Sequence, residues 1–238
     1  MINRRAMGIF ACVIYITSQL FAGGSITGTV TYEGKIPKLK KFDMATEPVC
    51  VMKHEKDPVK YTGRSEALVL GDGNTMANIF VQVISGLPEK EYPAPEEPVV
   101  LDQNGCTYMP HVLALMVGQP LKFLNSDSVL HNLHTLPEEN DEFNVTMPKF
   151  LKETIRSFEY PEGMFAIKCD VHPWMGGFIA VLEHPFFDVT EKDGQYQLND
   201  LPPGTYTLEA WHEKLGTRSA EVTITGDETK NIDILFKR

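Results

Sequence analysis

Short runs of alternating apolar and polar residues, separated by Gly, Pro, Asn and Asp, recur along almost the whole chain. Such alternation turns successive side chains to opposite faces of a strand, and no stretch carries the longer period of an amphipathic helix. The runs 205–211 (TYTLEAW) and 218–225 (RSAEVTIT) show the pattern clearly. The sequence therefore predicts an all-β protein of the sandwich or barrel type.

The segments between these runs have the composition of turns and loops. Asp193-Gly194 predicts a short hairpin, and the Pro- and Glu-rich residues 86–98 predict an exposed loop. Residues 34–66 have little periodicity and are expected to be irregular, and 137–150 form a polar loop with room for a short helix. Strands are expected at 25–33, 77–84, 112–117, 120–124, 154–159, 164–169, 177–182, 186–190, 195–198, 205–211, 218–225 and 230–236.

Residues 169–175 (CDVHPWM) set three metal-binding side chains on one short loop. Cys169, His172 and Met175 offer a thiolate, an imidazole and a thioether at Cys-x2-His-x2-Met spacing. Alternation along the expected strand 164–169 turns the Cys169 side chain inward, to the rim of an apolar core. The loop must then turn sharply to bring all three donors to one point.

A second imidazole comes from the upstream stretch 125–134 (NSDSVLHNLH). We expect a loop here, with His131 as the preferred ligand, because the neighbouring Asn132 can brace the loop by hydrogen bonding. His134 is the alternative to His131.

The combined donor set indicates which metal the site would bind. Two His, one Cys and a weak Met are the ligands of blue-copper centres, whereas zinc has little use for a thioether. Four protein ligands leave no open position for a substrate, so the set predicts one-electron transfer and no enzymatic role. The predicted ligands of one type 1 copper ion are His131, Cys169, His172 and Met175.

The remaining cysteines pose a pairing problem. Cys12 lies in the leader described below, and three cysteines are left, an odd number in an oxidising compartment. A metal thiolate at Cys169 leaves Cys50 and Cys106 to form a disulfide, which is the favoured interpretation. The alternative is a second soft-metal site in which these two cysteines join Met52, His54, Met109 and His111.

Residues 1–24 are expected to be a secretory signal peptide. Arg4 and Arg5 precede a mostly apolar run over 6–22, and small residues near its end suit a cleavage site. The polar residues 17–19 make the run a poor membrane span. We therefore expect a periplasmic or otherwise exported protein with no membrane insertion after cleavage.

The charge balance limits the partners. The chain has a net charge of −10, and loss of the two arginines in the leader gives −10 − 2 = −12. Nucleic-acid and anionic-membrane binding need basic patches, so neither fits. An acidic protein is steered toward a basic partner.

The distribution of ligands divides the chain. Residues 99–184 contain every favoured ligand, and 185–238 contain short strands and no cysteine. The strands expected within 25–98 could partly complete either unit, and the sequence leaves this open.

The segment with the metal-binding motifs resembles the cupredoxins. The CDVHPWM loop has the spacing of the ligand loop of amicyanin, and LKFLNSDSVLHNLH resembles the strand that delivers the first His. The resemblance implies the same four ligands and a Greek-key β-sandwich. Amicyanin and plastocyanin carry Pro before the second His, where this chain has Val171, a difference that concerns tuning more than ligation.

The chain after the leader also resembles exported proteins of the methylamine-utilisation type, which fuse a cupredoxin to a transthyretin-like, carboxypeptidase-regulatory-like β-sandwich. The matching stretches are GTVTYEG, MPHVLALMVGQP, CDVHPWMGGFIAV, HPFFDVTEKDGQYQL and LPPGTYTLEAWHEKLG. The resemblance implies a fold for 185–238 and no reaction. Three histidines in these stretches are expected to pack or hydrogen-bond: His111, His184 and His212.

The leading functional expectation is an exported carrier of single electrons to or from a c-type cytochrome or a redox enzyme. Electrons would pass through His172, beside an apolar patch of Pro173, Trp174 and Phe178. A periplasmic copper-binding or copper-delivery protein is one alternative, suggested by the surplus of soft donors. A structural or cell-surface module stabilised by copper is another.

Overall fold

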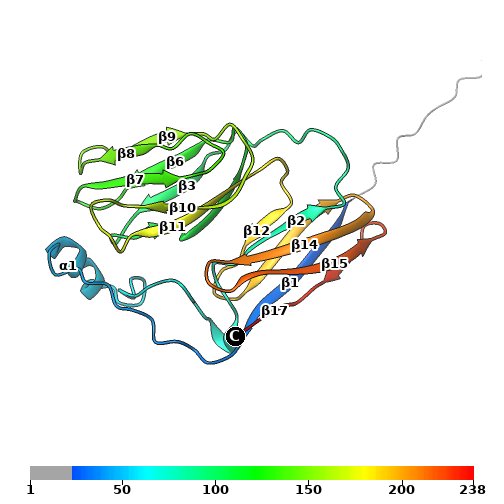
Figure 1. The fold of residues 1–238 in the computed structure, drawn as a ribbon, viewed down its shortest axis with the longest axis horizontal. Helices are drawn as coiled ribbons and strands as arrows, with labels where there is room; N and C mark the ends of the chain where they lie inside the picture. The colour runs from blue at the N-terminus through cyan, green and yellow to red at the C-terminus, as the bar shows by residue number, and fades with distance from the viewer. Residues whose placement is uncertain (1–22) are drawn as a thin grey trace, which may run out of the picture.

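The computed structural model describes residues 23–238, so the expected signal peptide lies outside the described residues except for its last two. The fold is all-β, and two β-sandwiches lie side by side (Figure 1). Two short helices are the exceptions in the described chain, α1 (Pro48–Lys56) and the 3-10 helix η1 (Asp72–Asn74). From residue 23 onward, no helix combines the length and apolar character that a membrane crossing requires.

The first sandwich, which we call the ligand sandwich, contains both expected metal-binding segments. One sheet has the order β5-β11-β10-β7-β8 and the other β4-β3-β6-β9. The pairs β5/β11 and β3/β6 are parallel and the others antiparallel. Its strands are β3 (Val99–Gln103), β4 (Tyr108–Met109), β5 (Val112–Met116), β6 (Leu121–Asn125), β7 (His131–Leu136), β8 (Asn144–Met147), β9 (Glu153–Arg156), β10 (Glu162–Lys168) and β11 (Gly176–Leu182).

The second sandwich, which we call the tail sandwich, packs the sheet β13-β1-β16, with β17 also on β1, against the sheet β12-β2-β14-β15. Its strands are β1 (Gly24–Glu33), β2 (Phe80–Ser85), β12 (Phe187–Val189), β13 (Gln195–Leu201), β14 (Gly204–His212), β15 (Gly216–Ile224), β16 (Thr229–Asn231) and β17 (Ile234–Lys237).

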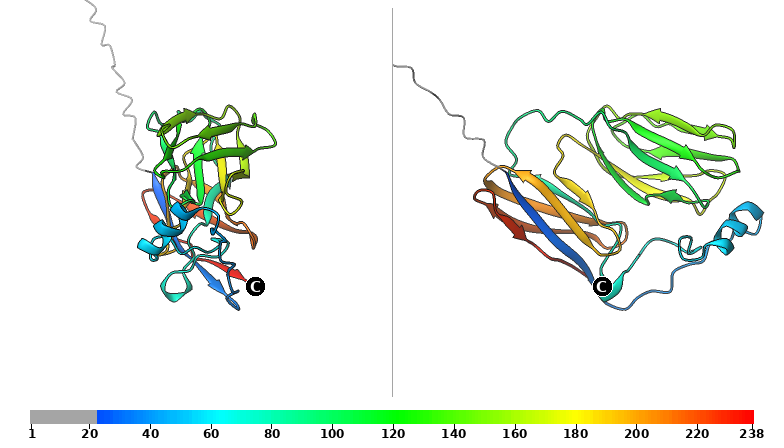
Figure 2. Two further views of the ribbon diagram at one scale, coloured as in Figure 1. Left: turned by 90° about the vertical axis from the view of Figure 1, so that its left-hand side faces the viewer. Right: turned by 180° about the vertical axis from the view of Figure 1, so that it is seen from behind.

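Strands β1 and β2 complete the tail sandwich, which the sequence had left open. β1 pairs with β13, β16 and β17, and β2 pairs with β12 and β14. The apolar side chains of β1 require this, since Ile26 and Val30 are fully buried in the tail core. Both ends of the described chain therefore build one sandwich, with the ligand sandwich inserted between them, and the two views of Figure 2 show β1 among the C-terminal strands.

Two local expectations are wrong, and a third holds except for one helix. The turn at Asp193-Gly194 is not a hairpin, because β12 and β13 belong to different sheets. The polar loop 137–150 has no helix and contains β8 instead. The region 34–66 is irregular except for α1, which begins with Pro48 in its first turn.

The expected apolar surface patch beside His172 does not include Phe178. Phe178 packs edge-on against Trp211 of the tail sandwich, with ring centroids 5.1 Å apart, and belongs to an apolar cluster between the sandwiches. His111 lies in the same region and hydrogen-bonds the Gly176 carbonyl at 3.1 Å and Glu213 at 3.0 Å. These side chains therefore hold the two sandwiches together.

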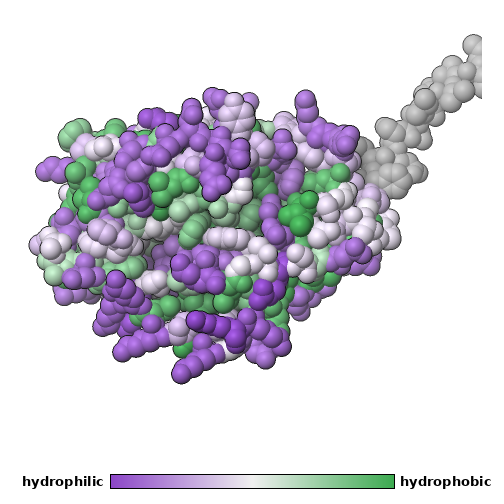
Figure 3. All heavy atoms as spheres, viewed as in Figure 1, coloured by the Kyte–Doolittle hydropathy of each residue, from purple (hydrophilic) through white to green (hydrophobic). Residues whose placement is uncertain are grey.

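Figure 3 shows one face of the molecule covered mostly by hydrophilic side chains, with smaller apolar areas among them.

The turn between β12 and β13 gives a test of the β1 packing. Gly194 has φ +70°, and a Cβ at this position would lie 2.6 Å from the Val30 carbonyl oxygen. We expect Gly194→Ala to lower the free energy of unfolding by about 2–4 kcal/mol, because left-handed strain and overpacking add. Chemical denaturation measures this.

The matched control is Gly216→Ala. Gly216 has the same φ, +70°, but no atom lies within 4 Å of its Cβ position. We expect Gly216→Ala to lower the free energy of unfolding by about 1–2 kcal/mol, the cost of the left-handed backbone alone. Equal losses at the two positions would contradict the close approach of β1 to the turn.

Candidate metal centre

His131 is the first residue of β7, a strand in the segment where the sequence had suggested a loop. β7 lies between β10 and β8 in its sheet. The side chain of His131 is fully buried, and Leu133 and Thr135 follow it on the inward face. Alternation therefore delivers the His131 ring to the end of the ligand core.

The loop 169–175 closes tightly between β10 and β11. The Cys169 N–H donates to the Met175 carbonyl at 3.1 Å, and the Met175 N–H donates to the His172 carbonyl at 2.9 Å. Both strands are in register at the loop base, where Lys168 pairs with Gly176. Cys169, His172 and Met175 are each only 2 % exposed.

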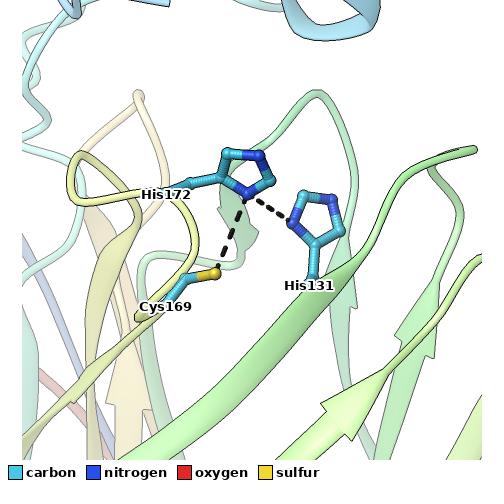
Figure 4. Close-up of side chains that lie close together, drawn as sticks. All are labelled: His131, Cys169 and His172. Atoms are coloured by element: carbon cyan, nitrogen blue, oxygen red, sulfur yellow. Dashed lines mark hydrogen bonds between the residues drawn. The ribbon is translucent and has the colours of Figure 1, made fainter. Parts of the chain in front are cut away.

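Three donor atoms meet at the end of the ligand sandwich, as Figure 4 shows. The Nδ1 atoms of His131 and His172 lie 2.9 Å apart, and Nδ1 of His172 lies 3.8 Å from the Cys169 Sγ. Ligand atoms of all three residues lie within 4.8 Å of one another, close enough to share one ion. Met175 lies buried on the same loop, and its role as a fourth ligand stays a prediction.

A buried carboxylate orients the His131 ring. The Nε2–H of His131 donates to Asp127 Oδ2 at 3.0 Å, which leaves Nδ1 to face His172. Burial would raise the pKa of Asp127, but hydrogen bonds from His131 and Lys53 outweigh burial and lower it. Asp127 is thus an ionised group that fixes a metal-binding ring from behind. The sequence analysis missed this role, although Asp127 lies in the turn four residues before His131.

The Cys169 thiol is tuned toward its thiolate. Burial raises its pKa, but hydrogen bonds from His131 and His172 outweigh burial and bring the pKa to about 6. Among the described residues, Cys169 is the free cysteine. A thiolate is the form that binds soft metals, so the site is prepared for one at neutral pH.

Asn132 braces the two metal-binding segments against each other. Its Oδ1 accepts hydrogen bonds from the Asp170 N–H at 2.8 Å and from the Cys169 thiol at 3.3 Å. Its carbonyl accepts the hydroxyl of Tyr108 at 2.6 Å. Asn132 therefore joins β7 to the start of the loop, the kind of bracing that the sequence suggested.

The structure places His134, the alternative to His131, outside the cluster. His131 and His134 are three positions apart on a strand, so their side chains leave opposite faces. Nε2 of His134 lies 2.6 Å from Glu142 Oε1, and Nδ1 lies 2.9 Å from Asp170 Oδ2, so both ring nitrogens face carboxylates. The alternative ligand is therefore wrong.

Cys50 and Cys106 form a disulfide, the pairing favoured from the sequence. The alternative second soft-metal site is wrong, because both sulfurs are bonded to each other. The same bond removes Cys106 as a thiolate ligand beside Asp127 and His131, although the three residues lie close together.

The donor set fits a copper ion. Two imidazole nitrogens and one thiol of lowered pKa face one another in a buried space at the end of the sandwich. Soft thiolate together with imidazole suits copper and also zinc, and a buried Met on the same loop favours copper. The residues that would hold the ion are His131, Cys169 and His172, with Met175 beside them.

Comparison with known proteins identifies one domain by sequence. Residues 184–237 match the carboxypeptidase regulatory-like domain, which covers β12 to β17 of the tail sandwich. No curated protein sequence matches the chain.

Solved structures show a weak, cupredoxin-like similarity of fold. They include a Cu-containing nitrite reductase from Thermus scotoductus SA-01, with 21% identity, a TM-score of 0.35 and coverage of 42% of this chain and 26% of that one. This chain thus spans only about a quarter of the reductase. The oxidised P94A mutant of amicyanin shares 22% identity, with a TM-score of 0.33 and coverage of 43% and 98%. A purple cupredoxin from Nitrosopumilus maritimus shares 28% identity, with a TM-score of 0.28 and coverage of 32% and 82%.

The tuned thiol predicts a pH dependence of the metal-free protein. We expect Cys169 to titrate near pH 6, compared with about 8.5 for an ordinary thiol. The pKa of Cys169 is lower in the folded protein than in the unfolded chain. Its ionisation therefore stabilises the fold fully above the unfolded pKa, and this stabilisation is lost as pH falls through about 6. The measurement is the ultraviolet thiolate absorption of the native protein minus that of Cys169→Ser.

Two variants control this titration. His131→Ala removes a hydrogen-bond donor to the thiolate and should move the midpoint upward, whereas His134→Ala should leave it unchanged. A native midpoint near the ordinary thiol value would contradict the geometry of the cluster.

Proposed function

We propose that this protein holds one type 1 copper ion through His131, Cys169 and His172, with Met175 as a weak fourth ligand, and carries single electrons. The observation that supports this most directly is that the Nδ1 atoms of His131 and His172 lie close to the free Cys169 thiol in a buried cluster. A bound copper would supply the one-electron Cu(I)/Cu(II) couple.

The rigidity of the surroundings supports electron transfer over catalysis. Two backbone hydrogen bonds close the ligand loop, Asp127 holds His131, and Asn132 ties the two segments together. Donors that are already in place change little between two charge states of an ion. The ligand side chains are nearly inaccessible to solvent, so we propose no enzymatic role.

The acidic chain supports a basic redox partner such as a c-type cytochrome, since complementary charge speeds encounter. We also propose export to the periplasm or an equivalent compartment, which the Cys50–Cys106 disulfide supports. We further propose a fusion of a cupredoxin with a transthyretin-like sandwich, of the methylamine-utilisation type; the match at 184–237 supports only its second, carboxypeptidase-regulatory-like part.

One observation favours a second candidate, copper binding and delivery. The side chain of His172 is only 3% exposed, so the ring through which electrons would leave is covered. A site closed on this side suits retention of the ion as well as electron exchange.

Spectroscopy tests the proposed function. We expect the Cu(II)-loaded protein to show intense visible absorption from a thiolate–copper bond and a reversible one-electron potential. Cys169→Ser should abolish the visible band, because it removes the thiolate. His134→Ala is the matched control and should keep the band, since that ring faces Glu142 and Asp170. A colourless native copper complex would overturn the proposal.

A further inference from the structure

Residues 41–64 form an excursion that lies over the metal-binding end of the ligand sandwich. Its base is closed by hydrogen bonds from the Phe42 N–H to the Gly63 carbonyl and from the Ser65 N–H to the Lys40 carbonyl, both 2.9 Å. The helix α1 lies at its far end, away from the tail sandwich from which the excursion starts (Figures 1 and 2). It adds no strand to either sandwich, but Met44 and Cys50 are buried in the ligand core.

The excursion contacts the support of the first imidazole. Lys53 of α1 forms an ion pair with Asp127 Oδ1, and the other oxygen of that carboxylate accepts the Nε2–H of His131. The neighbouring His54 ring bonds the Gly105 carbonyl at 2.6 Å. Lys53 therefore acts on His131 through one intervening residue.

The excursion also covers the second imidazole. Nε2 of His172, on the ring edge away from Cys169, lies 3.8 Å from Glu47 Oε2. This nitrogen is buried and has no hydrogen-bond partner in the part of the chain that the structure describes. In Figure 4 the blue ribbon of the N-terminal region lies above the His172 ring.

The disulfide fixes the excursion to both metal-binding segments. Cys50 lies on α1, and its partner Cys106 is fully buried. The Cys106 N–H donates to Asp127 Oδ2 at 2.8 Å, and its carbonyl accepts the indole N–H of Trp174, in the ligand loop, at 3.0 Å. One covalent bond thus links α1 to the supports of His131 and His172.

We propose that residues 41–64 are a cover held shut by the Cys50–Cys106 disulfide, and that reduction of this bond opens the His172 edge and governs how fast copper enters and leaves. This deepens the proposed function and rests on it. A dithiol reductant supplies two electrons and two protons. The Cys50–Cys106 bond breaks to two thiols, and the reductant becomes a disulfide. The excursion then stays attached at its base, and α1 is held by polar contacts of Lys53, His54 and Glu47 and by packing of Val51 on the ligand core, without a covalent bond.

The test measures transfer of Cu(I) from the loaded full chain to a coloured Cu(I) chelator. The variant Cys50→Ser/Cys106→Ser removes the disulfide without adding thiols that could bind the ion. We expect transfer at least about tenfold faster than from the native protein, because local opening exposes the site. The matched control is Met52→Ser, which changes an exposed soft donor on the same helix and should leave the rate unchanged. Native and double-variant rates within about twofold would overturn the cover.

A second measurement remains decisive if the double variant does not fold. Hydrogen exchange of the metal-free native chain, with and without a dithiol reductant, should show loss of protection in α1 while β7 and β10 keep theirs. Unchanged α1 protection after reduction would overturn the cover. A colourless copper complex would contradict the proposed function, but the exchange measurement would still test the cover. A coloured copper complex together with unchanged α1 protection after reduction would contradict the cover alone.

Discussion

A single buried carboxylate connects the parts of this molecule that build its candidate metal centre. Asp127 is almost fully buried, and a buried charge is tolerated only when it is paired and hydrogen-bonded. It accepts hydrogen bonds from the Gly105 and Cys106 backbone, from Lys53 and from His131. These groups come from the loop before β4, from α1 and from β7. Because the carboxylate requires all of them, it fixes their mutual positions and so sets the direction of the His131 ring.

The tail sandwich contributes to the same centre from the other side. It is built from both ends of the described chain, so the ligand sandwich leaves from it and returns to it. Directly after the ligand loop, the Gly176 carbonyl is held by His111, whose other ring nitrogen meets Glu213 of the tail sandwich. Phe178 packs on Trp211 across the same boundary. The exit of the metal-binding loop is therefore anchored to a second folded unit.

Much of the fold could be predicted from the sequence, because strands that bury one face carry the period of two. β14 and β15 were visible for this reason. α1 was not, since nine residues with one buried side chain have no helical periodicity, and the helix depends on its disulfide and on Lys53. The Asp193-Gly194 turn was misread because turn residues specify a reversal of the chain but not whether its two strands share a sheet. The choice between His131 and His134 depended on recognising β7 as a strand.

The pKa shifts of two groups at the candidate metal centre are linked. The pKa of Cys169 is lowered and that of His131 is raised, although burial opposes both shifts. Each group stabilises the charged form of the other, and this mutual effect outweighs burial at both. Lys53 and His131 act on Asp127 in the same way, because their hydrogen bonds offset the burial of its carboxylate and lower its pKa. The shifted pKa values and the placement of the donors thus have the same cause, the burial of a thiol beside an imidazole that Asp127 holds from behind.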